Sequence, residues 1–246
     1  MQTISSQPSS RLPVQSFCIA DLFRAEEIAA MGAAIHETVD RVARALRTPY
    51  AESAPHEDIF HRLQAIAGRD PVYASALVAA VFADTHRDPR IEGLKDDPRL
   101  YRAVAALCGE FEPGGMTVRV RVNVPAMTHK RHGWHSDVAI TTAVRPDSTC
   151  HTVLGACWIP LADVDEGSGG LELVSQPLKA PLAHHRTEDG AYVIPDALLE
   201  GLPRQSVSVR AGQAVVIDRF TPHRALPNLS DRVRWSVVAW VKGVKG

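Results

Sequence analysis

Apolar residues change their spacing near residue 116, and this change divides the chain into two predicted halves. Between residues 25 and 46 they recur at intervals of three and four, which is the stripe of an amphipathic helix. Further helices are expected from Pro71 to residue 82 and from Pro98 to Cys108, because proline is favoured in the first helical turn. The segment around residues 49–55 is expected to be a loop. The first half is therefore predicted to be mostly helical.

From Met116 onward the apolar period is two, which is typical of strands. Valines at positions 118, 120, 122 and 124 occupy one face of a predicted strand, and Thr117, Arg119, Arg121 and Asn123 occupy the other. More strands are expected over residues 152–159, 170–174, 206–210, 214–218 and 232–241. Helices that precede many short strands are typical of a β-sandwich or barrel with helices packed outside it.

Length and composition favour one large globular domain over residues 1–246. Within it we expect a flexible polar tail over residues 1–13, a mostly helical part over residues 14–115 and a β-rich core over residues 116–246. The chain is 45% hydrophobic, and its net charge of −1 leaves no electrostatic footprint for nucleic acid. No apolar run reaches the roughly 18 residues that a transmembrane helix needs. We therefore expect a small-molecule substrate, with neither nucleic acid nor membrane as partner; the sequence does not indicate an oligomeric state.

The cysteines do not form a recognisable metal or redox motif. A chain of this size needs no disulfide, so buried free thiols in a reducing cytosol are the expectation. The N-terminus lacks the basic start and apolar block of a signal peptide. Both observations favour a cytoplasmic location. The cysteines in question are Cys18, Cys108, Cys150 and Cys157.

Three His-x-Asp pairs occur in the chain, and one of them has a context that suits metal binding. Two lie in or beside predicted helices, where residues two apart do not face each other. These two are His56/Asp58 and His86/Asp88. The third pair, His135 and Asp137, follows a strand and a glycine, and in an extended segment residues i and i+2 point the same way.

A second histidine, His223, follows the strand predicted over residues 214–218, which could deliver it to the same site. Two histidines and a carboxylate fill one face of an octahedral ion and leave the other face open, as in non-haem Fe(II) oxygenases. Surface or core histidines are the alternative. An arginine eleven residues past His223 could hold the carboxylate of an oxo-acid co-substrate in a bidentate pair. Arg232 and Arg234 share one face of the last predicted strand, so the period alone does not choose between them.

Four ordered blocks resemble the phytanoyl-CoA dioxygenase family. They are WHSD (134–137), WIPLADVD (158–165), GGLELV (169–174) and GQAVVID (212–218), the last followed by His223, Asn228 and Arg234. The resemblance covers roughly residues 119–241, and the helical first half fits the family loosely. It implies a mainly β fold with flanking α-helices, built on a double-stranded β-helix (jelly-roll, cupin-like) core. It also implies Fe(II), 2-oxoglutarate as co-substrate and dioxygen.

Carried over by position, the resemblance makes His135, Asp137 and His223 the iron ligands. It places Arg234 on the distal carboxylate of 2-oxoglutarate, which leaves Arg232 as an exposed charge at the strand end. Trp158 stands where the family has a tryptophan near the co-substrate.

Two positions depart from the family pattern. A small hydroxyl residue often lies two positions beyond the distal histidine and helps to bind 2-oxoglutarate, but this chain has Ala225, so another group must supply that hydrogen bond or none does. The block after residue 171 usually ends in Gly-Ser-His, and here residues 174–177 read Val-Ser-Gln-Pro.

The polar face of the strand that begins at Met116 is a further candidate for the site. In a jelly roll this face could line the active-site cavity, because the opposite face is wholly valine; a solvated strand face is the alternative. We expect Asn123 beside the co-substrate, and Arg121 and Trp134 beside the substrate. The adjacent pair His184 and His185 and the basic loop over residues 129–132 are expected to be solvated.

The expected function is that of a non-haem iron 2-oxoglutarate-dependent dioxygenase that oxidises, and typically hydroxylates, a C–H bond of a small molecule. A natural-product or amino-acid-like intermediate is the expected substrate class. The same cofactor chemistry giving desaturation, epoxidation or ring closure is one alternative. A jelly-roll protein that binds a metal or ligand without turnover is an alternative of another class.

Overall fold

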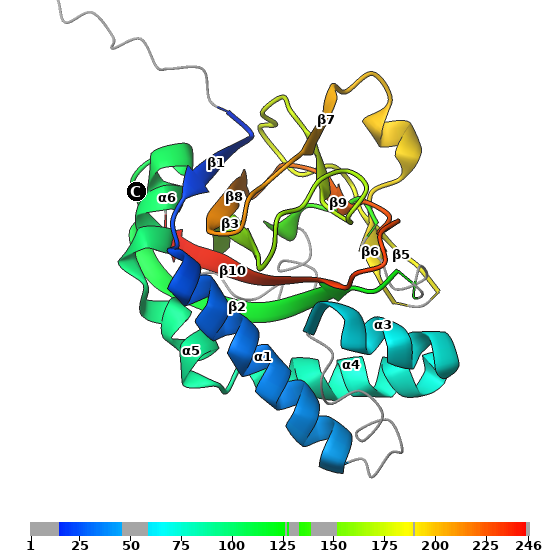
Figure 1. The fold of residues 1–246 in the computed structure, drawn as a ribbon. Helices are drawn as coiled ribbons and strands as arrows, with labels where there is room; N and C mark the ends of the chain where they lie inside the picture. Colours follow the sequence, from blue (N-terminus) through cyan, green and yellow to red (C-terminus); the bar gives the residue numbers. More distant parts are fainter. Residues whose placement is uncertain are drawn as a thin grey trace, which may run out of the picture.

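Helices gather against one side of a β-structure in the computed structural model (Figure 1). The structure describes residues 15–45, 59–125, 127, 133–138, 152–188 and 190–244. Several expectations lie outside these residues: the tail at 1–13, the loop at 49–55, the pair His56/Asp58, the basic loop at 129–132 and Cys150.

The larger sheet has five antiparallel strands in the order β1-β8-β3-β10-β2. In that order the strands are β1 (Phe17–Asp21), β8 (Gln213–Asp218), β3 (Thr152–Pro160), β10 (Arg234–Val244) and β2 (Glu112–Asn123). Strand β10 therefore lies next to β2, and β2 forms one edge of the sheet.

A smaller antiparallel sheet faces it, with the order β7-β4-β9. Its strands are β7 (Arg204–Val207), β4 (Leu171–Val174) and β9 (His223–Ala225). Side chains from both sheets, including Trp158, Leu173 and Val215, form one buried cluster between them. A two-stranded ribbon of β5 (His185–Arg186) and β6 (Tyr192–Val193) lies outside these sheets. Two facing antiparallel sheets with flanking helices confirm the predicted jelly-roll class.

The helices precede β2 in the chain. They are α1 (Ala25–Ala45), α3 (Ile59–Arg69), α4 (Pro71–Thr85), α5 (Pro89–Glu92) and α6 (Pro98–Cys108), with short 3₁₀ turns η1 (Gly93–Asp96) and η3 (Asp196–Leu199). An Asp-Pro pair starts each of α4, α5 and α6: the aspartate side chain accepts a backbone N–H of the first turn, and proline takes the position that has no donor to lose.

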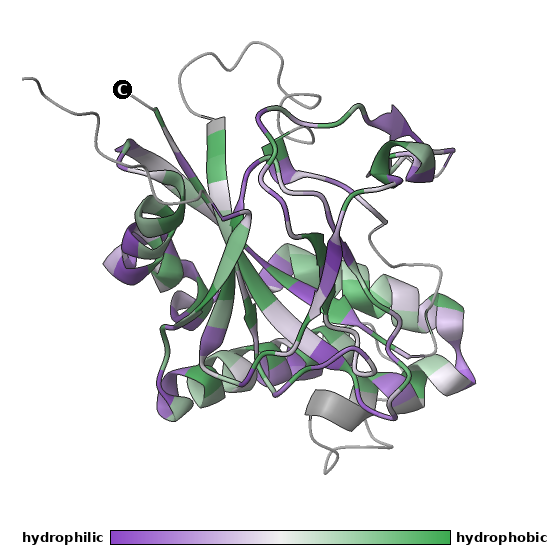
Figure 2. Ribbon diagram, turned by 90° about the horizontal axis from the view of Figure 1, so that it is seen from above, coloured by the Kyte–Doolittle hydropathy of each residue, from purple (hydrophilic) through white to green (hydrophobic). Residues whose placement is uncertain are grey.

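The helices pack on the outer face of the larger sheet. The valines predicted to share one face, such as Val118 and Val120, are buried here in the same cluster as Ile35 and Leu77 of the helices. In Figure 2 the strands are mostly coloured as hydrophobic, whereas hydrophilic colour alternates around the helices. The opposite, polar face of β2 consequently points between the two sheets.

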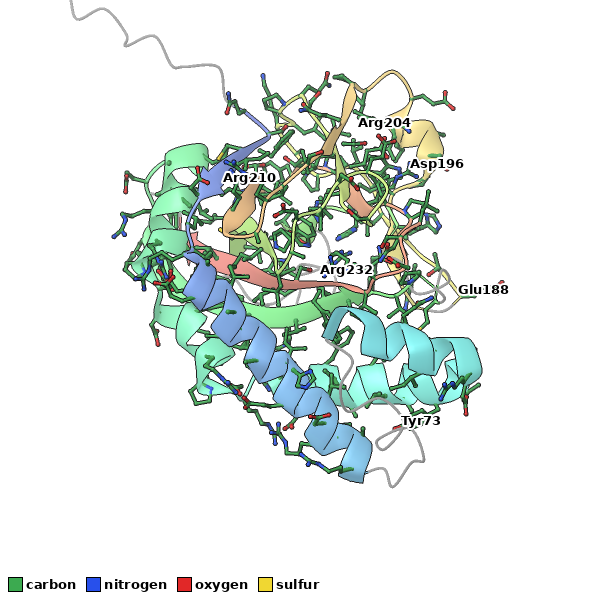
Figure 3. The ribbon with its side chains drawn as sticks, viewed as in Figure 1. Tyr73, Glu188, Asp196, Arg204, Arg210 and Arg232 are labelled. Carbon is green, nitrogen blue, oxygen red and sulfur yellow. The ribbon has the colours of Figure 1, made fainter. Side chains whose placement is uncertain are left out.

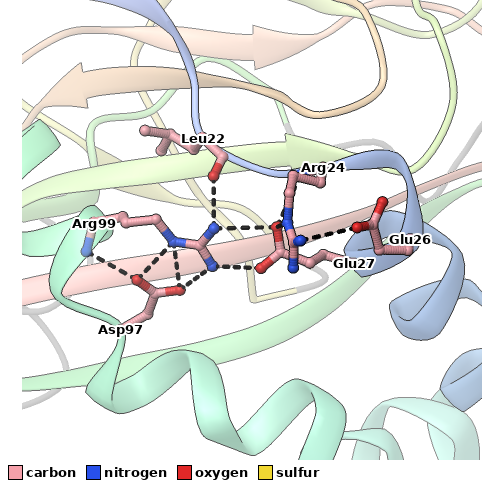
Figure 4. A network of polar contacts seen from close by, with 6 residues as sticks. All are labelled: Leu22, Arg24, Glu26, Glu27, Asp97 and Arg99. Atoms are coloured by element: carbon pink, nitrogen blue, oxygen red, sulfur yellow. Dashed lines mark hydrogen bonds and ion pairs between the residues drawn. The ribbon is translucent and has the colours of Figure 1, made fainter.

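An arginine joins the end of β1, the start of α1 and the start of α6 (Figure 4). Arg99 donates to the carbonyl of Leu22 at 2.9 Å and to both carboxylate oxygens of Glu27 at 2.8 and 3.1 Å. It also binds Asp97, the residue that caps α6. The hydrogen bonds from Arg99, joined by the backbone N–H of Arg24, lower the pKa of Glu27 to about 2.

Two further observations bear on the sequence-based expectations. Cys18, Cys108 and Cys157 form no disulfide, and burial raises the pKa of Cys157. In the described part of the chain no helix combines the length and apolarity that a membrane span requires.

Candidate functional site

His135 and His223 lie next to each other at the β9 edge of the smaller sheet. Residues 133–138 run beside β9, and the two histidines form an isolated antiparallel bridge with backbone N–H···O distances of 3.0 and 2.9 Å. The strand pairing of β9 with β4 fixes His223 at the sheet. The bridge then places His135, and with it Asp137, next to His223.

Three candidate metal ligands converge at this point. The Nε2 atoms of His135 and His223 each lie 4.0 Å from Oδ1 of Asp137, and one donor atom from each residue lies within 4.8 Å of the others. The imidazole rings are 4.3 Å apart between centroids. Small side-chain rotations would bring all three donors onto one octahedral ion, whose adjacent ligands lie roughly 3 Å apart.

Hydrogen bonds orient both imidazoles for coordination. Nδ1 of His135 lies 2.7 Å from the carbonyl of Gly133, and Nδ1 of His223 lies 3.0 Å from the carbonyl of Thr221. A proton on each Nδ1 satisfies these contacts and leaves the lone pair of each Nε2 facing Asp137. This tautomer is the one a metal-binding histidine adopts, so the residues present fit a divalent ion with nitrogen and oxygen ligands.

Arg234 presents a buried positive charge to the same cavity. Its Nε donates to the carbonyl of Gly169 at 2.9 Å and its Nη1 to Oγ of Ser236 at 2.8 Å, and its guanidinium carbon lies 5.4 Å from the ring centre of Trp158. Burial lowers the pKa of Arg234 to about 10, and no carboxylate of the described residues forms an ion pair with it. A buried cation that has only neutral partners is stabilised by an anionic ligand. Arg232, by contrast, is exposed in the turn before β10 (Figure 3).

A clamp holds the loop that carries the carbonyl of Gly169: the backbone N–H groups of Leu226 and Leu229 donate to the carbonyls of Gly170 and Gly167, and two asparagines fix the segment around Leu226. Asn123 donates from Nδ2 to the carbonyl of Leu226, and Asn228 donates to the carbonyls of Asn123 and Arg232. Gly169 has φ +77°, and a Cβ there would lie 2.6 Å from Nδ2 of Asn123. The sequence alone did not lead us to expect this clamp, although the Gly-Gly pair at 169–170 is a visible signal for it.

A cavity of about 690 Å³ connects these groups. Its lining includes the three candidate ligands, Arg234, Trp158, Asn123, Arg119 and Arg121, together with Ser75, Val78, Ala79 and Phe82 of α4. The polar face of β2 therefore lines the cavity rather than facing solvent. The helix α4 supplies a wall beside the edge strand, and sequence patterning had predicted the helix but not this position.

Trp134 lies elsewhere. Its ring packs with Val174, Ile194 and Leu199 in a separate buried cluster. The guanidinium carbons of Arg204, on β7 (Figure 3), and Arg224 stand 5.4 and 4.9 Å from the ring centre. Trp134 is not among the described residues that line the cavity, and its contact with substrate stays a prediction.

His184 has a contact that the sequence did not predict. Its Nδ1 lies 2.8 Å from the carbonyl of Leu182, and its Nε2 accepts the backbone N–H of Ser136 at 3.0 Å. Because Ser136 lies between His135 and Asp137, a neutral His184 fixes the backbone of the candidate metal-binding segment. Desolvation lowers the pKa of His184, which favours the neutral form. Its neighbour His185 is exposed, as expected.

Ala225 lines the cavity, as the departure from the family pattern implied. The hydroxyl nearest Arg234 in the hydrogen-bond network belongs to Ser236, which is fully buried and accepts from the guanidinium. Ser236 thus positions the arginine instead of standing in for the hydroxyl that position 225 lacks.

Solved structures of several enzymes share this fold. The α-ketoglutarate-dependent carbocyclase SnoK from nogalamycin biosynthesis aligns with a TM-score of 0.54 and 18% identity, over 94% of this chain and 80% of that one. EvdO2 from Micromonospora carbonacea var. aurantiaca, complexed with 2-oxoglutarate, gives 0.53 and 18%, over 94% and 87%. The epimerase SnoN, also from nogalamycin biosynthesis, gives 0.52 and 17%, over 94% and 77%.

A further EvdO2 structure aligns over 63% of either chain, with a TM-score of 0.47 and 22% identity. No curated protein matches the sequence significantly.

The family model for phytanoyl-CoA dioxygenases matches residues 17–236, a stretch that contains the smaller sheet, the helical layer, the three candidate ligands and Arg234, and that ends within β10. The chain belongs to the phytanoyl-CoA dioxygenase (PhyH) family.

Proposed function

We propose that the chain is an Fe(II)- and 2-oxoglutarate-dependent dioxygenase that hydroxylates a C–H bond of a small molecule. His135, Asp137 and His223 are the proposed iron ligands, and Arg234 is the proposed anchor for 2-oxoglutarate. The observation that carries the proposal is that a buried arginine with only neutral partners shares one cavity with a converging His-Asp-His set.

Charge and shape support these roles. Two neutral imidazoles and one carboxylate leave a net positive charge on a bound Fe(II), which the keto-acid end of 2-oxoglutarate can offset. The distal carboxylate then pairs with Arg234, where the pair is desolvated and hydrogen-bonded. Trp158 and the amide of Asn123 flank this position. Bound iron and 2-oxoglutarate supply the oxidative decarboxylation that drives oxidation of the substrate.

The cavity wall supports the same proposal. Val78, Ala79 and Phe82 of α4 close the cavity beside β2 with apolar surface. Excluding water protects a reactive intermediate and strengthens the electrostatic contacts within the site. The volume of about 690 Å³ leaves room for a small-molecule substrate beyond the co-substrate.

The test is an anaerobic titration of the metal-free protein with Fe(II) and then with 2-oxoglutarate. The readout is the weak visible charge-transfer band of an iron-chelated keto-acid. Wild type should develop the band. His135→Ala should abolish it, and Arg234→Ala should shift its midpoint about 30-fold or more to higher 2-oxoglutarate, because a buried charged contact contributes roughly 2–5 kcal/mol.

Arg232→Ala is the matched control, because Arg232 lies two residues away and is exposed. It should titrate as wild type does. A wild-type protein that binds iron and shows no band at saturating 2-oxoglutarate would favour a jelly-roll binding protein without oxygenase turnover.

Other outcomes of the same cofactor chemistry are the second candidate. SnoK is named a carbocyclase and SnoN an epimerase, and both share the fold of this chain. Their origin in nogalamycin biosynthesis supports a natural-product intermediate as the substrate class, ahead of an amino-acid-like compound. Mass analysis of the product separates hydroxylation, which adds one oxygen, from ring closure or desaturation, which removes two hydrogens, and from epimerisation, which leaves the mass unchanged.

A further inference from the structure

Positive charges continue along the cavity beyond the position of Arg234. Strands β2 and β10 are in register so that Asn123 is opposite Arg234, Arg121 is opposite Ser236 and Arg119 is opposite Val238. Residues of one face follow at steps of two, roughly 6.8 Å apart. Arg121, Arg119 and, farther along β10, Lys242 therefore line the cavity at increasing distance from the candidate ligands.

The side chain of Arg121 extends away from Arg234. Its guanidinium carbon lies 5.2 Å from the ring centre of Trp240 and 6.0 Å from that of Phe82, which belongs to α4. Its one hydrogen bond in the described structure is a long one of 3.4 Å to the carbonyl of Val120. The guanidinium is thus stacked between aromatic faces, while its donors remain available to a ligand.

This cluster of cations has no matching acid. Burial lowers the pKa of Arg121, an effect that Asp137 partly offsets and Arg119 reinforces. Across the described cavity lining, Asp137 is the single carboxylate. Neither Arg119, Arg121 nor Lys242 forms an ion pair within the described part of the chain.

The formal charges of the cavity do not balance unless a further anion binds. The two positive charges of Fe(II) and the charge of Arg234 match the negative charge of Asp137 and the two of 2-oxoglutarate. The inner cavity is then neutral, and the outer cavity keeps the three positive charges of Arg119, Arg121 and Lys242. Partly buried like charges repel one another, so an anion bound among them is stabilised.

We propose that Arg119, Arg121 and Lys242 bind an anionic group of the substrate, a carboxylate or a phosphate, while its apolar or aromatic body lies against Phe82, Val78 and Trp240. The inference rests on the proposed function, since iron and 2-oxoglutarate occupy the inner cavity. It deepens that function by assigning the substrate class: a small acid with an apolar body.

The test measures binding of a fluorescent aromatic anion, anilinonaphthalenesulfonate, to the anaerobic protein already saturated with Fe(II) and 2-oxoglutarate, so that Arg234 is occupied. Wild type should bind it, and increasing salt should weaken the binding. Arg119→Gln combined with Lys242→Gln should weaken it about tenfold or more. Arg210→Gln, at an exposed arginine labelled in Figure 3, should leave it unchanged.

Competition identifies the group that is bound. Naphthoate and naphthyl phosphate should displace the fluorescent anion, and whichever displaces it at lower concentration indicates the carboxylate or the phosphate. Neutral naphthol, of similar body, should compete about tenfold more weakly or not at all. Arg121→Lys, which keeps the charge and loses the flat stacking surface, should retain more affinity than Arg121→Gln.

Three results overturn the proposal. The first is equal binding of the anion to wild type and to the Arg119→Gln/Lys242→Gln variant, and the second is equal competition by naphthol. The third is loss of the 2-oxoglutarate band in that variant while its thermal unfolding stays cooperative, because the cations would then serve the co-substrate. Absence of the band in wild type is a different result. It removes the oxygenase, whereas binding of the fluorescent anion to the metal-free protein still decides whether the anion subsite exists.

Discussion

The backbones of His135 and His223 exchange two hydrogen bonds, so that residues 88 positions apart in the chain hold their imidazoles 4.3 Å apart. The relative position of the two rings is consequently set by strand-like pairing. Side-chain rotamers need to supply only the last adjustment toward a metal ion.

Replacing His184 should weaken metal binding without removing a ligand. In His184→Ala the backbone N–H of Ser136 loses its acceptor, and the segment that carries His135 and Asp137 gains freedom. We expect Fe(II) or Mn(II) affinity to fall about tenfold, as it does when groups that orient ligands are lost. Calorimetric titration under anaerobic conditions measures the change.

His185→Ala is the control for that experiment, because His185 is the exposed neighbour. Equal affinities of the two variants would show that the contact with Ser136 does not organise the site.

Gly169→Ala should cost more stability than its backbone conformation alone explains. Gly169 and Gly201 have nearly the same φ, +77° and +75°, but a Cβ at 169 would lie 2.6 Å from Nδ2 of Asn123, whereas a Cβ at 201 would meet no atom within 4 Å. Gly201→Ala should lose about 1–2 kcal/mol from left-handed strain. Gly169→Ala should lose a further 1–3 kcal/mol or so from overpacking.

Urea unfolding of the two variants beside wild type measures the difference. Gly169→Ala should also bind 2-oxoglutarate more weakly, since its carbonyl accepts from Arg234. Equal stabilities of the two variants would mean that Asn123 moves aside at no cost.

2-Oxoglutarate should raise the unfolding temperature of the Fe(II)-loaded protein, because it binds the folded state alone. At a concentration of 100 times its dissociation constant the gain is about 2.7 kcal/mol. Arg234→Ala should lose most of this gain at the same concentration, and Arg232→Ala should keep it. An undiminished rise in Arg234→Ala would place the distal carboxylate on another group.

The contact of Glu27 with Arg99 should support stability in a defined pH range. Because the pKa of Glu27 falls from 4.5 to about 2 on folding, its contribution is complete above pH 4.5 and disappears as the pH falls towards 2. The stability difference between wild type and Glu27→Gln should therefore be constant from pH 7 to pH 5 and shrink below that. Glu26→Gln, at an exposed residue paired with Arg24, serves as the control.

Urea unfolding at several pH values tests this dependence. A difference between wild type and Glu27→Gln that grew on acidification would contradict it, because the folded-state pKa would then lie above that of the unfolded chain.

Local sequence patterns predicted those helices and strands whose formation depends least on contacts with distant parts of the chain. The stripe of α1, the proline starts of α4 and α6 and the alternation of β2 are each visible within a few turns or residues. Strand β1 was not predicted, because its five residues gain their order from pairing with β8, some 200 residues later. The short β9 likewise depends on β4 and on the bridge to His135.

The same distinction applies to the site. The candidate ligands and Arg234 were recognised from motif order, which records positions in the chain. The bond from Ser136 to His184 and the clamp of Gly169 by Asn123 and Asn228 depend on loops brought together by folding. Trp134 shows the reverse case: its neighbours in sequence are candidate ligands, yet its ring points into a separate apolar cluster.

Because α4 lies beside the edge strand β2, the residues of the candidate iron and co-substrate site and one wall of the cavity come from separate segments of the chain. Candidate iron and co-substrate contacts are encoded between residues 123 and 234, while one wall of the substrate chamber is encoded by a single helix at Pro71–Thr85. A new chamber can therefore arise by exchange of one contiguous segment, with the oxidative centre inherited intact. Grafting that helix from a relative should accordingly alter selectivity while the candidate ligands and Arg234 are kept.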